Sequence, residues 1–163
     1  MAPFDEAFLI IIGHEGGCVN DPNDRGGETK YGISKVRYPN EDIPNLSLDR
    51  AKFLFKRDFW DTCRCGEMVW PISLLVFDAA INSGEEYGRK LLQRALGVLP
   101  DGVLGPISMR VLKERSLGPW ALAAELLSLR MHDMTKFGTW QPHGLGWTRR
   151  ILKLAFQACG KVA

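Results

Sequence analysis

Residues 14–34 read HEGGCVNDPNDRGGETKYGIS and follow, after Gly13, the most apolar segment of the chain, FLIII at residues 8–12. Five glycines and a mixture of acidic and basic side chains make this stretch unsuited to a protein core. The apolar side chains of residues 4–12 recur at helical spacing, and Gly16 suits the position just after a helix end. We therefore expect a helix over residues 4–15, with Glu15 in its last turn, followed by a turn-rich segment.

The rest of the chain predicts a mainly α fold with one small β region. Turn-forming pairs divide residues 16–34, and TKYGI at residues 29–33 fits a short hairpin. Ser47 suits the N-cap of the next helix, because its side-chain oxygen can accept a hydrogen bond from a first-turn amide. From apolar periodicity and from Pro and Gly boundaries, we expect helices over residues 48–60, 71–84, 86–97, 107–115, 119–137 and 146–158.

The carboxyl group of Glu15 is a candidate general acid. A helix C-terminus and the apolar neighbours Ile11 and Ile12 both disfavour its charged form, which predicts a raised pKa. Asp24 lies in a polar turn and is expected to stay ionised, and two carboxyls in such opposite environments are typical of glycoside hydrolysis. The hydroxyl of Thr29 is a candidate for holding a water molecule. Spacing does not separate Asp24 from two rivals for the second role, Asp21 and Glu28.

Four blocks of sequence, in chain order, carry a family resemblance. They are HEGGCVNDPNDRGGETKYGISK at residues 14–35, FDAAINSG at 77–84, LLQRALGVLPDGVLGP at 91–106 and FGTWQPHGLGWTRRI at 137–151. Together they resemble the glycoside hydrolase family 108 lysozymes, the N-acetylmuramidases of phages and bacteria. The resemblance implies a lysozyme-like helical fold with a small β-hairpin wing beside an active-site cleft. It also implies cleavage of the β-1,4 bond between N-acetylmuramic acid and N-acetylglucosamine, with Glu15 as general acid. The order of Glu15, Asp24 and Thr29 also resembles that of phage-type lysozymes, which implies that Asp24 and Thr29 are its partners.

The same resemblance implies two regions along the chain. Residues 1–91 correspond to the muramidase region with the catalytic glutamate. Residues 92–163 resemble the predicted peptidoglycan-binding module of the family, and we expect both regions to pack into one compact unit. Peptidoglycan is then the expected partner, and no cofactor is implied.

Several other residues have both a functional and a structural interpretation. Tyr31 either lines a sugar subsite or packs the hairpin onto the helices. Asn82 and Ser83 either cap a helix end or bind substrate in the cleft. Asp78, inside an apolar helix, is expected to be structural and needs a partner or an outward position. The basic pair Arg149 and Arg150 is expected on a solvated face. The five tryptophans are candidates for the core or the cleft wall: Trp60, Trp70, Trp120, Trp140 and Trp147.

Composition limits the other classes of function. The net charge of +2 is small and the basic residues are spread along the chain, so nucleic acid is not an expected partner. His14 and Glu15 begin a zinc-protease pattern, but Cys18 replaces its second histidine, so no metal site is expected. We expect free thiols, with a disulfide as the alternative, at the four cysteines, which are Cys18, Cys63, Cys65 and Cys159.

The N-terminal sequence has no basic region before its short apolar run, so we expect no cleavable signal peptide. Action on the cell wall then requires a holin or a secretion system for export from the cytoplasm, and a monomer is favoured. Three alternatives remain open at this point. They are a lytic transglycosylase that uses the same glutamate, a chitinase, and a non-catalytic wall-binding or secretion-assisting protein that retains the fold.

Overall fold

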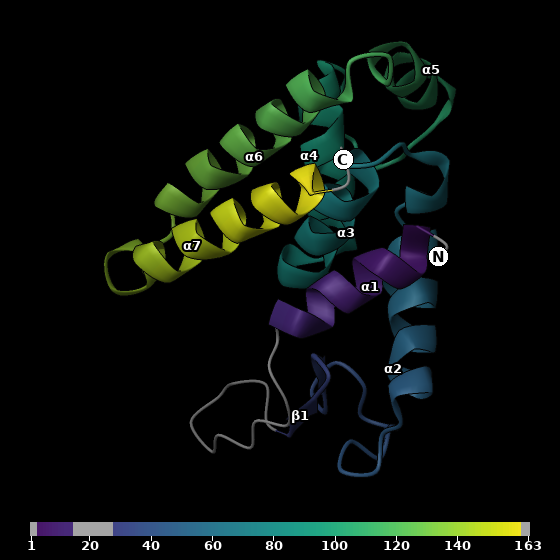
Figure 1. Cartoon of the computed structure of the whole chain (residues 1–163), viewed down its shortest axis with the longest axis vertical. Coiled ribbons are helices and arrows are strands. Elements are labelled where there is room, and N and C mark those ends of the chain that lie inside the picture. Colours follow the sequence, from purple (N-terminus) through teal and green to yellow (C-terminus); the bar gives the residue numbers. More distant parts are fainter. Residues whose placement is uncertain (1–2, 15–27, 161–163) are drawn as a thin grey trace. The chain divides into compact units, whose positions relative to one another are not determined.

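The computed structural model of the chain describes residues 3–14 and 28–160. The chain forms two compact units, Met1–Asp58 and Phe59–Ala163. Helices dominate both units, and a two-stranded antiparallel sheet lies in the first (Figure 1). The predicted mainly α fold with a small β-hairpin is therefore confirmed. The predicted regions 1–91 and 92–163 rest on resemblance and remain a prediction; residue 91 falls inside a continuous helix.

In the first unit, helix α1 spans Pro3–His14 and packs its apolar face against helix α2, Leu48–Phe55. The Phe8 ring meets the Phe55 ring edge-on, with centroids 5.7 Å apart. Lys52 on α2 forms a 2.7 Å ion pair with Asp5 in the first turn of α1. The expected helix over residues 4–15 is thus present as far as His14, and Glu15 lies outside the described residues.

The predicted hairpin forms from β1, Thr29–Lys30, and β2, Ile33–Ser34. The strands pair antiparallel, with Thr29 opposite Ser34 and Lys30 opposite Ile33. Tyr31 and Gly32 form the turn, both with positive φ, 53° and 77°. Two central residues of this kind give the strands the twist that a two-residue hairpin requires. Ile33 is fully buried and anchors the hairpin in the first unit.

Helix α2 begins where the sequence predicts. The Ser47 hydroxyl oxygen accepts a 3.1 Å hydrogen bond from the Arg50 amide, as expected of an N-cap. The predicted helix over residues 48–60 is not uniform, because a π-helical turn at Lys56–Asp61 follows α2. Within that turn the adjacent Phe59 and Trp60 are both buried.

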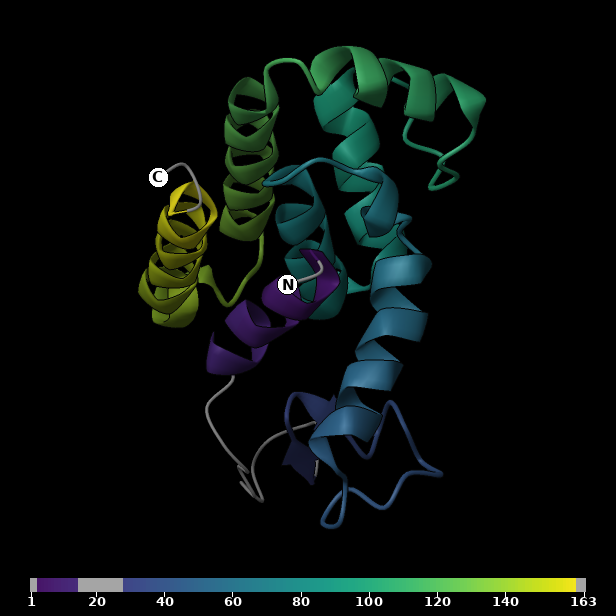
Figure 2. The same cartoon turned by 45° about the vertical axis from the view of Figure 1, so that its right-hand side comes forward.

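The second unit is helical (Figures 1 and 2). A short 3₁₀ helix, Cys65–Glu67, precedes α3, Ile72–Ser83, whose residues 72–80 are all buried. Helix α3 packs against α4 and α6, and α6 packs along α7. The remaining bounds are α4 Glu85–Leu96, α5 Pro106–Arg115, α6 Pro119–Thr135 and α7 Trp140–Cys159.

Helix α7 begins at residue 140, not at the predicted residue 146. The sequence prediction was wrong because Pro142, Gly144 and Gly146 all weigh against a helix. Pro142 lies in the first turn, where a helix tolerates proline. Gly144 faces the Trp140 side chain so closely that a Cβ at residue 144 would lie 2.8 Å from two atoms of the Trp140 ring. Side-chain packing therefore outweighs local propensity in this turn.

Three cysteines lie within the described residues, and all are free thiols. Cys63 and Cys65 are buried, and burial raises the pKa of Cys63 to about 11. Cys159 is exposed on α7. In residues 3–14 and 28–160 we find no group of three or more His, Cys, Asp or Glu side chains suited to holding a metal ion. None of the described helices has the length and apolar character needed to cross a bilayer.

Candidate functional site

The hairpin of the first unit carries two of the predicted site residues. Thr29 opens β1 and Tyr31 occupies the turn, and both side chains are partly exposed. Lys30 lies between them, and its Nζ is 5.6 Å from the centroid of the Tyr31 ring. Glu28, a rival for the second carboxylate role, is exposed just before the hairpin. The other predicted acidic residues, Glu15, Asp24 and Asp21, lie outside the described residues.

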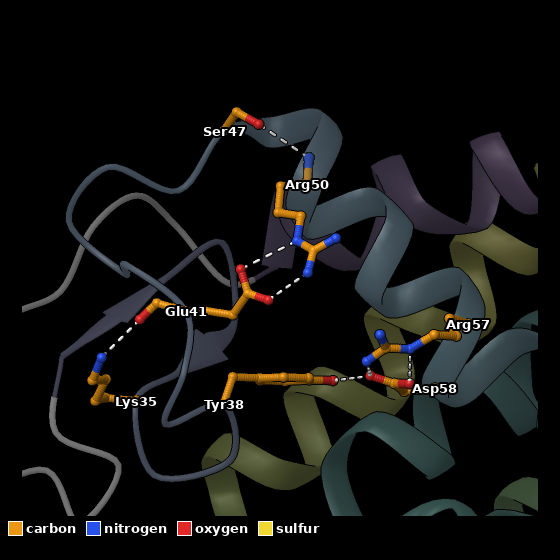
Figure 3. A network of polar contacts seen from close by, with 7 residues as sticks. All are labelled: Lys35, Tyr38, Glu41, Ser47, Arg50, Arg57 and Asp58. Carbon is orange, nitrogen blue, oxygen red and sulfur yellow. Dashed lines mark hydrogen bonds and ion pairs between the residues drawn. The ribbon is translucent and has the colours of Figure 1, made fainter.

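A polar network holds the segment after the hairpin onto α2 (Figure 3). Lys35 Nζ donates a 2.8 Å hydrogen bond to the backbone oxygen of Glu41. The Glu41 carboxylate accepts two hydrogen bonds from Arg50, 2.6 Å from Nη2 and 3.2 Å from Nε. Arg50 thereby holds the pKa of Glu41 below its usual value. A second link runs from Lys30 Nζ to the backbone oxygen of Pro44, at 2.8 Å.

Tyr38 provides the other attachment of this segment. Its hydroxyl donates a 2.9 Å hydrogen bond to Asp58, whose carboxylate also binds Arg57 at 2.5 and 2.7 Å (Figure 3). Burial and the bond to Asp58 raise the pKa of Tyr38 to about 12, while the Arg57 guanidinium lowers the pKa of Asp58. Both groups therefore keep one protonation state across the physiological pH range, and the Tyr38–Asp58 bond adds to the Glu41–Arg50 and Lys30–Pro44 links that hold this segment.

The second unit contains a cavity of about 330 Å³ at the end of α3. Asn82 and Ser83, predicted from sequence as substrate-binding residues, both line it. Asn82 Nδ2 also donates a 2.9 Å hydrogen bond to the backbone oxygen of Asp78, one turn earlier in α3, while Gly84 is the C-cap of this helix. The capping role that the sequence suggested for Asn82 and Ser83 therefore belongs to Gly84, and their role in substrate binding stays a prediction. The other lining residues come from α6, the following loop and α7: Met134, Phe137, Trp147 and Arg150.

Aromatic rings form one side of this cavity. The Phe137 and Trp147 rings meet edge-on, with centroids 6.0 Å apart. Trp147 also lies 6.0 Å from Trp140 and stacks at 6.0 Å on His143. Apolar rings beside an amide and a hydroxyl are the usual lining of a small-molecule site.

The Arg150 side chain links the cavity to a buried ion cluster. Arg150 Nη2 donates a 2.9 Å hydrogen bond to Asp78 Oδ1, and Arg130 Nη1 donates to Asp78 Oδ2. Burial raises the pKa of Asp78, but the two guanidinium groups outweigh it and hold the pKa below its usual value. The predicted structural role of Asp78 is met by these partners. The prediction that the pair at residues 149–150 lies on a solvated face is wrong for Arg150, and Arg149 is exposed.

Of the five tryptophans, Trp60 is buried against Phe77, with ring centroids 5.3 Å apart. Trp70 donates its indole N–H to the backbone oxygen of Ala158 at 2.9 Å. Trp120 is exposed, while Trp147 lines the cavity. The aromatic block FGTW at residues 137–140 was a sequence signal for the aromatic side of the cavity. No local sequence pattern indicated that Arg150 would line the same cavity as Asn82.

Comparison with known proteins shows similarity to a glycoside hydrolase family and to one solved structure. A family model described as Glycosyl hydrolase 108 matches residues 8–84, which include the second half of α1, the hairpin, α2 and α3. This match, with the mainly α, lysozyme-like fold, supports a glycoside hydrolase with a function of the peptidoglycan hydrolase type. The solved structure described as Brucella abortus SagA is similar over nearly the whole chain, with 25% sequence identity and a TM-score of 0.86. The similarity covers 96% of this chain and 94% of SagA, and no curated protein matches the sequence.

Proposed function

We propose that this chain is an N-acetylmuramidase that cleaves the β-1,4 bond between N-acetylmuramic acid and N-acetylglucosamine. Glu15 protonates the glycosidic oxygen as general acid. Asp24, with Thr29, positions water or stabilises the oxocarbenium-like transition state. The observation that carries the proposal is the match of residues 8–84 to the glycosyl hydrolase model, because that range contains all three residues.

The cavity of the second unit supports a saccharide substrate. Sugars present apolar ring faces and hydroxyl groups, which suit the Trp147 and Phe137 rings beside the Asn82 amide and the Ser83 hydroxyl. Arg150 adds a cation that suits an anionic group of the wall. We propose that this cavity binds part of the glycan strand, and that export through a holin or a secretion system brings the protein to the wall.

The decisive experiment is turbidity loss of purified peptidoglycan with the wild type beside Glu15→Gln. Gln keeps the shape and hydrogen-bonding capacity of Glu but lacks the transferable proton, so a loss of at least about 100-fold is expected with folding intact. A folded E15Q protein that clears wall at the normal rate would refute the assignment. Asp24→Asn is expected to reduce turnover while wall binding survives. A larger loss in Asp21→Asn or Glu28→Gln would transfer the second role to that residue.

Product analysis separates this proposal from its enzymatic rivals. A muramidase leaves reducing N-acetylmuramic acid ends, whereas a lytic transglycosylase leaves an anhydro sugar that mass spectrometry resolves. A chitinase would digest chitin oligomers instead of wall. Detection of anhydro ends alone would retain Glu15 as the acid and remove the role of water.

A further inference from the structure

The outer side of α7 carries a row of exposed apolar side chains. Leu145, Leu152 and Phe156 are spaced by seven and four residues, so they lie on one face of the helix. Their exposed fractions are 65%, 51% and 75%. The residues of α7 that pack inward are a different set, Gly144, Ile151, Leu154 and Ala158. The exposed row is therefore separate from the core-facing side of the helix.

Two exposed cations, Arg149 and Lys153, lie beside this row. We call Leu145, Arg149, Leu152, Lys153 and Phe156 the outer face of α7. Every charged residue of α7 is cationic, and residues 134–163 contain no Asp or Glu. Large apolar side chains bordered by Lys and Arg are the pattern of a helix that lies in the plane of a membrane interface.

The apolar surface continues from α7 onto α6. A groove of about 500 Å³ runs between the two helices, which lie side by side in Figures 1 and 2. Leu152 belongs both to this groove and to the outer face. The groove is lined mainly by apolar side chains, and its lining residues are Leu127, Ser128, Met131, His132, Thr135, Ile151, Leu152 and Ala155. Contiguous exposed apolar surface of this kind marks an interaction site.

Charge determines the partner of this surface. Helix α6 has two acidic residues, Glu125 and Asp133. The Asp133 carboxylate is already paired with Arg94, at 2.5 Å. Two copies of the outer face would bring four cations together, which opposes self-association. A polysaccharide wall offers apolar ring faces for stacking in a cavity, but no apolar layer into which the exposed Leu152 and Phe156 side chains could both insert. We propose that the outer face of α7 binds the surface of an anionic phospholipid bilayer, with Phe156 and Leu152 in the acyl boundary and the cations on lipid phosphates.

The test is co-sedimentation of the purified full chain with vesicles. One set contains phosphatidylglycerol and phosphatidylethanolamine, and the other contains phosphatidylcholine alone. The wild type should bind the anionic vesicles, and this binding should weaken with added salt. Arg149→Gln with Lys153→Gln should weaken that binding by roughly 25-fold, at about fivefold per cation. The matched control removes two exposed cations of α5, Arg110→Gln with Lys113→Gln, and should bind as the wild type does.

The apolar contribution has its own pair of variants. Leu152→Gln with Phe156→Gln should reduce binding at least about tenfold, from lost burial of two large side chains. The matched control, Leu99→Gln with Leu117→Gln, changes two exposed residues elsewhere in the second unit and should leave vesicle binding unchanged. Circular dichroism checks the fold of each variant. Wall hydrolysis should be unchanged in all of them, so this proposal and the muramidase proposal fail independently.

A probe on the helix itself keeps the test decisive if a variant fails to fold. The exposed thiol of Cys159 can carry an environment-sensitive fluorophore in a Cys18→Ser chain, and its emission should shift to the blue on anionic vesicles. Equal binding to both vesicle sets, no binding to either, or equal losses in the control pairs would overturn the proposal. Two other results would also overturn it. One is a dimer in solution that the Leu152 and Phe156 changes abolish while vesicle binding is unaffected. The other is sedimentation with purified peptidoglycan that the same changes abolish while vesicle binding is unaffected.

Discussion

Replacing Asp78 with asparagine should strongly destabilise the protein. The Asp78 side chain is 0% exposed, and its two partners, Arg130 and Arg150, are 2% and 21% exposed. Asparagine preserves the volume but removes the charge, which leaves the Arg130 guanidinium buried without a counter-ion. Within the described chain, Nε and Nη2 of Arg130 are buried and lack a hydrogen-bond partner, so no other contact there replaces the lost one. Removal of one member of a buried ion pair costs about 3–5 kcal/mol.

The assay is unfolding by urea and by heat, followed by circular dichroism. For a chain of this size each kcal/mol shifts Tm by about 2–4 °C, so Asp78→Asn should lower Tm by roughly 6–20 °C. Arg50→Gln is the matched control, because it breaks an ion pair with Glu41 in which Arg50 is 45% exposed. Exposed pairs contribute about 0–1 kcal/mol, so this variant should unfold near the wild-type temperature.

The pH dependence gives a second check on the same cluster. Burial raises the pKa of Asp78, but Arg130 and Arg150 lower it further, so its folded-state pKa is below the unfolded value. A depressed carboxyl pKa stabilises the fold above the unfolded pKa, near 3.9, and this stability is lost as pH falls through the folded pKa. The difference between wild type and Asp78→Asn should therefore be constant from about pH 7 to 5 and shrink below about pH 4.

Two results would refute this reasoning. One is a D78N protein whose free energy of unfolding lies within about 1 kcal/mol of the wild type at pH 7. The other is a stability difference that grows on acidification. Replacing the pair together, as Asp78→Leu with Arg130→Met, should recover much of the loss, because a well-packed apolar pair often equals a buried ion pair in stability.

Two further predictions concern the aromatic wall and the general acid. Gly144→Ala places a Cβ 2.8 Å from the Trp140 ring and should shift tryptophan fluorescence and slow wall hydrolysis. Gly146→Ala, whose Cβ would have nothing within 4 Å, should instead stabilise the helix by up to about 1 kcal/mol. Equal fluorescence in both variants would contradict the packing argument. The rate on soluble wall fragments should be bell-shaped in pH, since activity needs Asp24 ionised and Glu15 protonated, with the falling limb on the order of pH 6–7. A falling limb near pH 4 would show that the Glu15 carboxyl has an ordinary pKa.

The features that the sequence predicted well are local ones. Ser47 caps α2 because a serine before an apolar periodic run supplies the missing acceptor within three residues. The hairpin follows from Tyr31-Gly32 between two short strand segments, and Gly97 ends α4 with a positive φ of 74°. Each depends on residues only a few positions apart, so no knowledge of the tertiary structure was needed.

The features that the sequence could not predict depend on distant residues. Asp78 needed a partner, but its partners lie 52 and 72 residues further along the chain, in α6 and α7. The early start of α7 depends on packing between Trp140 and Gly144, whereas local propensity favoured a later start. Asn82 and Ser83 were predicted as site residues, but their cavity depends on where the ends of α6 and α7 lie against α3.

The buried ion cluster connects the structural and functional interpretations of the second unit. Asp78 carries one negative charge and binds two cations, so the cluster has an excess positive charge. Arg150 is the member that also lines the cavity, and this places the excess charge beside Asn82 and Ser83. The same hydrogen bonds tie α6 and α7 to α3, and α7 carries the Trp147 ring of the cavity wall. A single carboxylate inside an apolar helix therefore links the helices around the cavity and holds the cationic Arg150 at its wall.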